Sequence, residues 1–260
     1  MWARRLSVLV ALALFAHGAA ASVSVEVTDG LVLYLNFDEG AGTTARDSSG
    51  AGNDGTLVGN VSWVPGQIGG AISVGDDAFE NSVVVANDPS LNPDSEITLA
   101  AWARSESYPD DNNSLITKAD TWMIHVSNWR GEAGSIDWEP LIWSPGFVAW
   151  QTTASALVAL GEWHHFVGTY DGATTVTYID GEEVGRFDQT GPIATSDVDV
   201  VIGRDSRSCC AERKATQIID EAMIWNRAIG PGEVGIVMSG GVAVEARGKL
   251  ATAWGALKTR

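Results

Sequence analysis

Alternating apolar and polar residues form short runs along most of the chain, and Gly, Pro, Asn and Asp separate these runs. A period of two is typical of strands with one buried face, and the intervening residue types are typical of turns. The pattern therefore predicts an all-β fold in which two antiparallel sheets pack as a sandwich. The predicted strands are Leu31–Phe37, Ser82–Val85, Ile97–Arg104, Ser114–Lys118, Trp122–Val126, Ile136–Trp143, Phe147–Thr152, Trp163–Tyr170, Thr174–Ile179, Val198–Ile202 and Ile218–Trp225.

One short helix is predicted near the end of the chain, at Gly230–Met238. Pro231 suits a first helical position, and the carboxylate of Glu233 favours the positive end of the helix dipole. The following residues, 243–260, are basic, in contrast to the acidic chain before them. They are expected to form a loosely ordered terminus, or alternatively a tail whose Trp254 docks on the sandwich or on a partner.

The first 21 residues have the three parts of a secretory signal peptide. Arg4 and Arg5 are followed by an apolar run from Leu6 to Phe15 and by small residues at Ala19–Ala21. The run is too short to span a bilayer. We therefore expect a secreted protein, extracellular or periplasmic, with a signal peptide at 1–21, one β-sandwich domain at 22–242 and a basic tail at 243–260.

The chain is strongly acidic, with a formal net charge of −17. Removal of residues 1–21 takes away two arginines and no acidic residue, which makes the charge more negative by two. An acidic surface repels phosphate backbones and argues against nucleic acid as a partner. It is compatible with cations and with neutral polymers such as glycans.

Two Asp-Gly pairs stand at the ends of neighbouring predicted strands, in the segment Gly161–Gly172 and at Asp180-Gly181. Asp-Gly is a strong hairpin signal. The first segment reads G-x-W-H-H and ends T-Y-D-G, which closely resembles laminin-G-like domains of the concanavalin A-like superfamily. Three further blocks match that family in its order, namely Leu31–Gly40, Ile97–Ala103 and Ile219–Ile229. The resemblance covers about residues 25 to 240 and implies a jelly-roll sandwich.

The same resemblance implies a structural calcium ion. In related sandwiches the opening strand and the late Ile-Asp-Glu strand lie close together, and an aspartate of the latter helps to hold calcium. Carried over, Asp220 is the best candidate ligand, Asp38 is next, and Asp47 and Asn53 are weaker candidates. These residue types supply the oxygen ligands that calcium prefers. The alternative is that Asp47 and Asn53 only cap turns.

A possible catalytic motif occurs at Ser135–Glu139, which is similar to the E-(apolar)-D-(apolar)-(apolar)-E motif of glycoside hydrolases on the same sandwich. That chemistry needs a carboxylate nucleophile, and the nucleophile position here is Ser135. A serine without a base does not replace a carboxylate at the anomeric carbon. We therefore predict that the protein is not an enzyme. His164 and His165 are adjacent on a strand, point to opposite faces and are expected to be structural.

Tryptophans are numerous, 11 in all, and several crowd the middle third of the chain. Most are expected to pack in the core. Because aromatic rings also stack on sugar rings, Trp129 and Trp138 are predicted to line a ligand groove, with Arg130, Asp137 and Glu139 as polar neighbours.

The only cysteines, Cys209 and Cys210, are adjacent. Their Cα atoms lie about 3.8 Å apart across a trans peptide, below the usual disulfide range. An ordinary bridge is therefore excluded, which leaves a vicinal disulfide, a reduced pair or an intermolecular link. Export to an oxidising compartment favours the vicinal disulfide.

Together these features predict a secreted, non-enzymatic β-sandwich that binds a carbohydrate or a glycosylated surface and holds one structural calcium ion. Two alternatives stay open. One is a polysaccharide hydrolase or lyase on the same scaffold, and the other is a module that binds extracellular protein.

Overall fold

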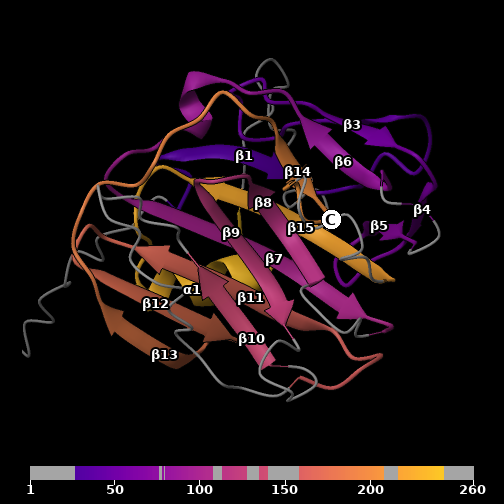
Figure 1. Cartoon of the computed structure of the whole chain (residues 1–260). Helices are drawn as coiled ribbons and strands as arrows, with labels where there is room; N and C mark the ends of the chain where they lie inside the picture. Colours follow the sequence, from indigo (N-terminus) through magenta and orange to yellow (C-terminus); the bar gives the residue numbers. More distant parts are fainter. Residues whose placement is uncertain are drawn as a thin grey trace, which may run out of the picture.

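The computed structural model consists of two antiparallel β-sheets and one short α-helix (Figure 1). It describes residues 27–75, 78, 80–107, 113–127, 135–139, 158–207 and 216–242, with residues 135–139 described through their backbone. The prediction of an all-β sandwich with a short late helix is confirmed. No helix in these ranges is long and apolar enough to cross a membrane.

The first sheet has eight strands. It contains the segment His164–Tyr170, which follows Trp163, and the Ile-Asp-Glu segment at residues 219–221. Its strand order is β13 (Glu182–Asp188), β12 (Thr174–Ile179), β11 (His164–Tyr170), β7 (Ile97–Ser105), β15 (Gln217–Trp225), β5 (Gly70–Val74) and β4 (Val61–Pro65), and β1 (Leu31–Leu35) also pairs with β15. The pairing of β1 with β15 brings the start and the end of the described chain together.

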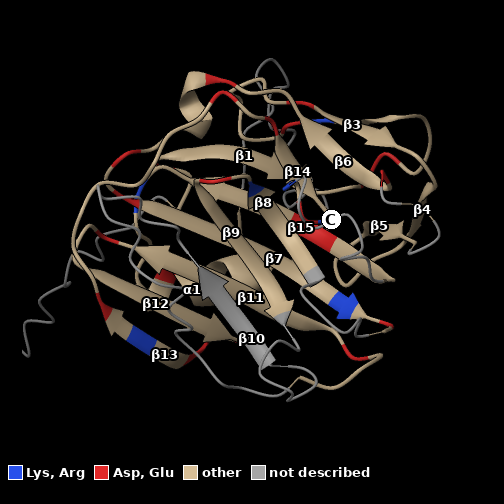
Figure 2. Ribbon diagram, in the orientation of Figure 1, with Lys and Arg blue, Asp and Glu red and all other residues tan. Residues whose placement is uncertain are grey.

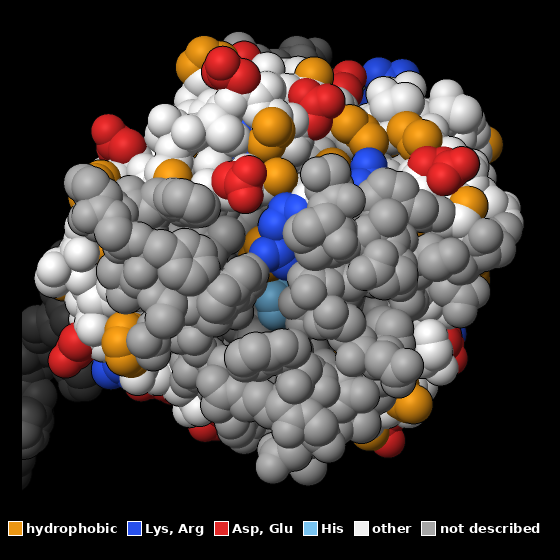
Figure 3. Space-filling view, in the orientation of Figure 1, with side chains coloured by type: hydrophobic (Ala, Val, Ile, Leu, Met, Phe, Trp, Pro, Cys, Tyr) orange, Lys and Arg blue, Asp and Glu red, His pale blue; other side chains and the backbone are white. Residues whose placement is uncertain are grey.

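The second sheet has seven strands and lies nearer the viewer in Figure 1. Its order is β10 (Ser135–Glu139), β9 (Trp122–Ser127), β8 (Asn113–Lys118), β14 (Val200–Ile202), β6 (Ser82–Val85), β3 (Gly55–Val58) and β2 (Thr44–Ala45). Figure 3 shows this side of the molecule, where basic and histidine side-chain atoms are visible near the middle.

The main core lies between the sheets, because strands of both contribute alternate apolar residues to it. Leu33, Ile97 and Ile219 come from the first sheet, and Ile124 and Ile202 come from the second. These five side chains are fully buried. The apolar positions of the period-two pattern are therefore those whose side chains lie between the two sheets.

A second apolar cluster covers the outer face of the first sheet. The helix α1 (Pro231–Met238) contributes Val234 and Val237, which pack in one cluster with Trp225 and Val167 of the sheet. Trp225 Nε1 also donates a hydrogen bond of 2.7 Å to the Val27 carbonyl. Since this face is covered as well, β15 is buried along its whole length.

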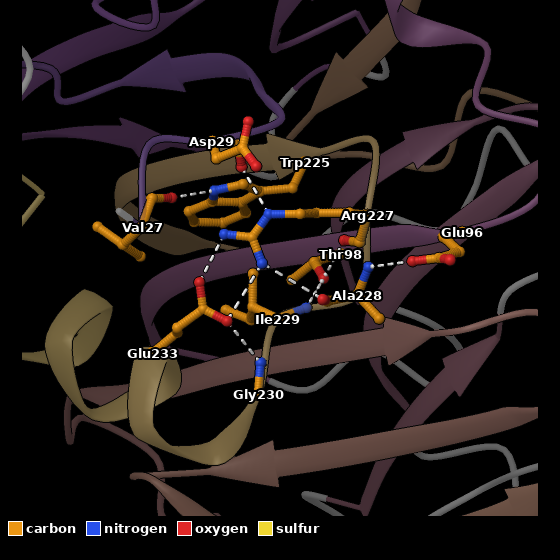
Figure 4. A network of polar contacts seen from close by, with 10 residues as sticks. All are labelled: Val27, Asp29, Glu96, Thr98, Trp225, Arg227, Ala228, Ile229, Gly230 and Glu233. Atoms are coloured by element: carbon orange, nitrogen blue, oxygen red, sulfur yellow. Dashed lines mark hydrogen bonds and ion pairs between the residues drawn. The ribbon is translucent and has the colours of Figure 1, made fainter. Parts of the chain in front are cut away.

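Arg227 fixes the helix to the sheet (Figure 4). Its guanidinium donates to both carboxylate oxygens of Glu233 in the first turn of α1 and to the Asp29 carbonyl. Burial alone raises the pKa of Glu233, but the hydrogen bonds from Arg227 and from the Gly230 amide hold it below its ordinary value. The hydrogen bond from Arg227 to the Asp29 carbonyl connects the two ends of the described chain.

The Asp-Gly signal at Asp180-Gly181 is confirmed as a two-residue hairpin turn. Ile179 pairs directly with Glu182, and the two turn residues have φ of 51° and 83°. Two positive φ values in succession are the geometry of a type I′ turn, which Asp-Gly adopts readily.

Most predicted strands are found within one or two residues of their expected bounds. The sequence pattern missed β2, β3, β4, β5 and β13, and the part of the predicted strand Ile136–Trp143 beyond Glu139 lies outside the described residues. The missed strands carry partly exposed or small residues, so their alternation is weak. The predicted strand Phe147–Thr152 lies outside the described residues.

Candidate functional site

The candidate site is built on a bulge in β15, which Figure 2 shows as an acidic stretch inside an otherwise uncharged strand. Asp220 pairs with Trp102, but the next residue of β15 to pair with β7 is Met223. Ile219 and Ala222 both belong to the core between the sheets. The two residues between them, Asp220 and Glu221, therefore share the outer face.

At the bulge, the backbone of Glu221 adopts the left-handed conformation, with a φ of 53°. Phe37, on the neighbouring chain segment, also has a positive φ of 54°. Such conformations cost about 1–3 kcal/mol each for residues other than glycine. Bulges often re-aim side chains beside functional sites. Both strained residues are next to an aspartate of the site, because Phe37 precedes Asp38 and Glu221 follows Asp220.

Asp220 is fully buried, with 0% of its surface exposed. Its Oδ2 accepts a hydrogen bond of 2.9 Å from the Ile68 amide, but its Oδ1 has no hydrogen-bond partner among the described residues. Burial raises the pKa of Asp220 to about 7, and Glu221 raises it further, while the Ile68 amide opposes the change. A buried oxygen without a donor is an available ligand for a cation.

Glu221 is also buried, with 3% of its surface exposed. Its Oε2 accepts a hydrogen bond of 2.7 Å from the Tyr34 hydroxyl in β1. Burial raises the pKa of Glu221 to about 7 against the lowering effect of that hydrogen bond. The pKa of Tyr34 lies well above its usual range because of burial, the hydrogen bond to Glu221 and the nearby charges of Asp220 and Asp38.

The loop at 66–70 brings Asp38 and Asp220 to one place. Gly70 N–H donates to Asp38 Oδ1 at 2.8 Å, while the Ile68 amide of the same loop donates to Asp220. Gly66 N–H closes the loop on the Gly69 carbonyl at 3.0 Å. A Cβ atom on Gly69 would lie 2.2 Å from Asp38 Oδ1, so only glycine permits this approach. The early and late aspartates therefore meet at this loop.

Asp47 and Asn53 lie in a separate loop and organise it internally. Asp47 accepts hydrogen bonds at both carboxylate oxygens, from the amides of Tyr34, Ser49, Gly52 and Asn53 and from the Ser49 hydroxyl. Asn53 Nδ2 donates to the Val32 carbonyl at 2.7 Å and to Ser90 Oγ at 3.0 Å. These contacts match the turn-capping alternative.

Two carboxylates and backbone carbonyls are the donor set available to a cation at the 66–70 loop. Neither Asp38 nor Asp220 is paired with a basic side chain in the described ranges. The same ranges hold no group of three or more His, Cys, Asp and Glu side chains arranged to hold a metal. A bound cation would thus take further ligands from backbone oxygens such as the Phe37 and Gly70 carbonyls, which crowd this loop.

The predicted ligand groove is described only in part. Trp129 and Arg130 lie outside the described residues, as do Cys209 and Cys210. Asp137, Trp138 and Glu139 lie on β10, where they pair with His125, Ile124 and Met123 of β9.

The two histidines of the Trp-His-His motif have different surroundings. His164 Nδ1 lies 2.8 Å from Asp180 Oδ2, in the Asp-Gly turn. His165 is fully buried and its ring lies against Trp102, with 5.2 Å between the ring centroids. Burial lowers the pKa of His165 to about 4, although Asp180 acts in the opposite direction. A neutral, enclosed ring fits a structural role.

The sequence analysis missed Glu221, Tyr34 and the 66–70 loop. The signal for Glu221 was present, because two adjacent acidic residues inside a nine-residue strand of otherwise uncharged residues are exceptional. Tyr34 and the loop carried no such signal.

A laminin-G-type family model, described as the concanavalin A-like lectin/glucanases superfamily, matches residues 76–235. This is more than half of the chain. A search of curated protein sequences found no match.

Several solved structures share the fold at low sequence identity. Domain 4 of AbnA, a GH43 extracellular arabinanase from Geobacillus stearothermophilus, solved in complex with arabinotriose, is 18% identical with a TM-score of 0.63, and the match covers 80% of this chain and 98% of that domain. The binding domain of Paraclostridial Mosquitocidal Protein 1 is 16% identical with a TM-score of 0.63, covering 82% of this chain and 53% of that one.

The binding domain of botulinum neurotoxin DC, solved in complex with rat synaptotagmin II, gives a TM-score of 0.62 at 15% identity, covering 82% of this chain and 52% of that one. The chain thus spans about half the length of these toxin domains. These similarities concern the fold.

Proposed function

Because the chain belongs to the concanavalin A-like lectin/glucanase superfamily, we propose that it is an exported, non-catalytic module that binds carbohydrate. The observation that carries the proposal is the match to AbnA domain 4, which spans almost all of that domain and was solved with arabinotriose. The acidic net charge of −17 agrees with a neutral polymer as ligand and disfavours nucleic acid.

The proposed lack of catalysis is supported by the burial of Asp220 and Glu221, the two carboxylates of β15 whose pKa values are raised. Groups with perturbed pKa values are candidates for acid–base chemistry. Asp220 and Glu221 have such values, but their exposed fractions of 0% and 3% leave no access for a glycosidic bond. Both side chains also face the covered side of the first sheet. They are therefore better suited to structure than to hydrolysis.

The proposal includes a calcium ion at the 66–70 loop, with Asp220 and Asp38 as side-chain ligands. Support comes from Asp220 Oδ1, a buried oxygen without a hydrogen-bond partner in the described chain, and from the backbone carbonyls that crowd the loop. A calcium ion here neutralises buried negative charge and holds the 66–70 loop, which connects β4 and β5, against Asp38 and Asp220. Asp47 and Asn53 have their own partners and stand outside this set.

A glycan array tests the proposed function directly. The full chain is applied to neutral and acidic polysaccharides in calcium and in chelator, and the supernatants are analysed for released sugars. Calcium-supported binding without released sugars is expected. Released products would instead favour the hydrolase or lyase alternative. A chain that binds no glycan but captures an extracellular protein would replace the proposal with the protein-binding alternative, which the toxin domain solved with synaptotagmin II illustrates.

A further inference from the structure

An open polar pocket of about 490 Å³ lies outside the site on β15 and shares none of its residues. It forms where the loop after β6, with the short helix η1 (Pro89–Leu91), runs beside the loop that precedes β14 (Figure 1). Its lining consists of Asn87, Pro89, Asn92, Thr195, Ser196 and Asp197.

Hydrogen bonds hold the two loops in a fixed relation. Asn92 Oδ1 accepts from the Ser196 amide at 3.3 Å, and Asp199 Oδ1 accepts from the Asn87 amide at 2.9 Å. Asn92 Nδ2 donates to Asn87 Oδ1 at 2.9 Å. The pocket walls are therefore preorganised, which lowers the entropic cost of binding a ligand.

Lys118 lies behind the pocket with 0% of its surface exposed. Its ammonium donates to Asn87 Oδ1 at 2.6 Å and to the Val198 carbonyl at 2.8 Å. Both acceptors are neutral, and no carboxylate of the described chain is in direct contact with Lys118. Burial lowers the pKa of Lys118 to about 8, against Asp199 and Asp197, so the side chain stays mainly charged at pH 7.

This buried cation fixes the orientation of the Asn87 amide. Because an ammonium only donates, Oδ1 must face Lys118 and Nδ2 must be the other end of the amide. Nδ2 has no hydrogen-bond partner in the described part of the chain. A charge on the acceptor side polarises the amide and strengthens its N–H donors. The pocket thus contains an oriented donor that no described residue uses.

The rim supplies acceptors to complement that donor. Thr195 and Asp197 are exposed, and neither side chain has a hydrogen-bond partner among the described residues. A sugar hydroxyl both donates and accepts, so it can use an amide N–H and a carboxylate together. Asp197 and Asp199 repel an anionic ligand, so the charges favour a neutral polyol over an acidic one.

We propose that this pocket binds a neutral saccharide unit, with Asn87 Nδ2 donating and Asp197 and Thr195 accepting from its hydroxyls. The inference rests on the proposed carbohydrate-binding function and assigns it a place in the fold. The exposed ring of Pro89 offers an apolar surface to the sugar, and the described lining contains no aromatic side chain. Without aromatic stacking we expect a dissociation constant on the order of 1 mM.

The test titrates the isotope-labelled full chain with arabinotriose, cellotriose, maltotriose and trigalacturonate, followed by NMR. At least one neutral trisaccharide is expected to bind and to shift the Asn87 side-chain amide signals. Trigalacturonate should bind at least about tenfold more weakly.

Two variants and a control locate the site. Asn87→Asp keeps an oxygen for Lys118 but removes the amide donors, and Asp197→Ala removes an exposed carboxylate that makes no hydrogen bond in the described chain. Each should weaken neutral trisaccharide binding about tenfold, whereas Glu182→Ala removes an exposed carboxylate on β13 and should leave it unchanged. If the wild type binds and both variants bind equally well, the pocket assignment is wrong and the proposed function stands. If the wild type binds none of the four trisaccharides, the pocket assignment is wrong, and the glycan array decides the proposed function separately.

Discussion

His165 offers a direct test of how the sandwich is stabilised, because its ring is buried in its neutral form. The ring packs against Trp102 on the outer face of the first sheet, and neither ring nitrogen has a hydrogen-bond partner in the described chain. Asp180, which accepts a hydrogen bond from the His165 amide at 2.9 Å, is the charged group that acts on it. The perturbation is the substitution His165→Leu, which keeps an apolar side chain at this position.

The expected magnitude follows from the pKa of His165, which falls from an ordinary 6.5 to about 4. A base with a lowered folded-state pKa costs nothing above pH 6.5, and its penalty grows as the pH falls from 6.5 towards 4. At pH 4.5 the penalty is roughly 2–3 kcal/mol, since lowering a pKa by one is worth about 1.4 kcal/mol. At pH 7.5 the variant should match or slightly exceed the wild type, because it removes two buried nitrogens that lack partners in the described chain.

Urea unfolding at several pH values between 7.5 and 4.5 measures this effect as the difference between the two proteins. Titrations shared by both, including those of Asp220 and Glu221, cancel in that difference. The free energy of unfolding of His165→Leu should exceed that of the wild type by an amount that grows as the pH falls. A difference that stays constant with pH would show that His165 has the same pKa in the folded and the unfolded protein, and would refute the reasoning.

Three further predictions concern the first sheet and its loops. In chelator, the raised pKa of Asp220 means that its own contribution to wild-type stability falls as the pH rises from about 4 to 7. Asp220→Asn should therefore be more stable than wild type at pH 8. Calcium should raise the melting temperature of the wild type but not of this variant, and an equal rise in both would exclude Asp220 as a ligand. In urea unfolding, Gly69→Ala should destabilise the protein by about 1–3 kcal/mol more than Gly50→Ala. Both glycines have a positive φ, but only at Gly69 would the added Cβ meet a carboxylate. Equal losses of stability would contradict the argument that Asp38 crowds Gly69. Arg227→Ala should lower the free energy of unfolding by about 2–3 kcal/mol, since it leaves the buried Glu233 carboxylate without its ion-pair partner. A loss under about 0.5 kcal/mol would show that the ion pair does not hold α1.

Strands with one strictly buried face could be predicted from the sequence. Thr174–Ile179 and Ser82–Val85 were predicted with their observed bounds, because flanking turn residues end their alternating runs. Edge strands such as β4 and β13 were missed because their residues are partly exposed on both faces and carry little periodic signal.

The candidate site was predictable only where one residue carried its own signal. Asp220 carried a signal through its place in the Ile-Asp-Glu block that resembles the family, whereas no alternating pattern predicts the bulge that places Glu221 on the same face. The saccharide pocket depends on Lys118, which looks like an ordinary end-of-strand lysine in the sequence. Its significance comes from the fold, which places Asn87 and Val198 around its ammonium.

The most direct test of binding without cleavage uses one sample for two measurements. The full chain is titrated calorimetrically with the best-binding neutral oligosaccharide at pH 7.5 in calcium, and after a day of incubation the sugar is recovered for mass spectrometry. Saturable binding and an intact oligosaccharide are predicted. Shortened or unsaturated sugars in the recovered material would contradict the assignment of a non-catalytic module.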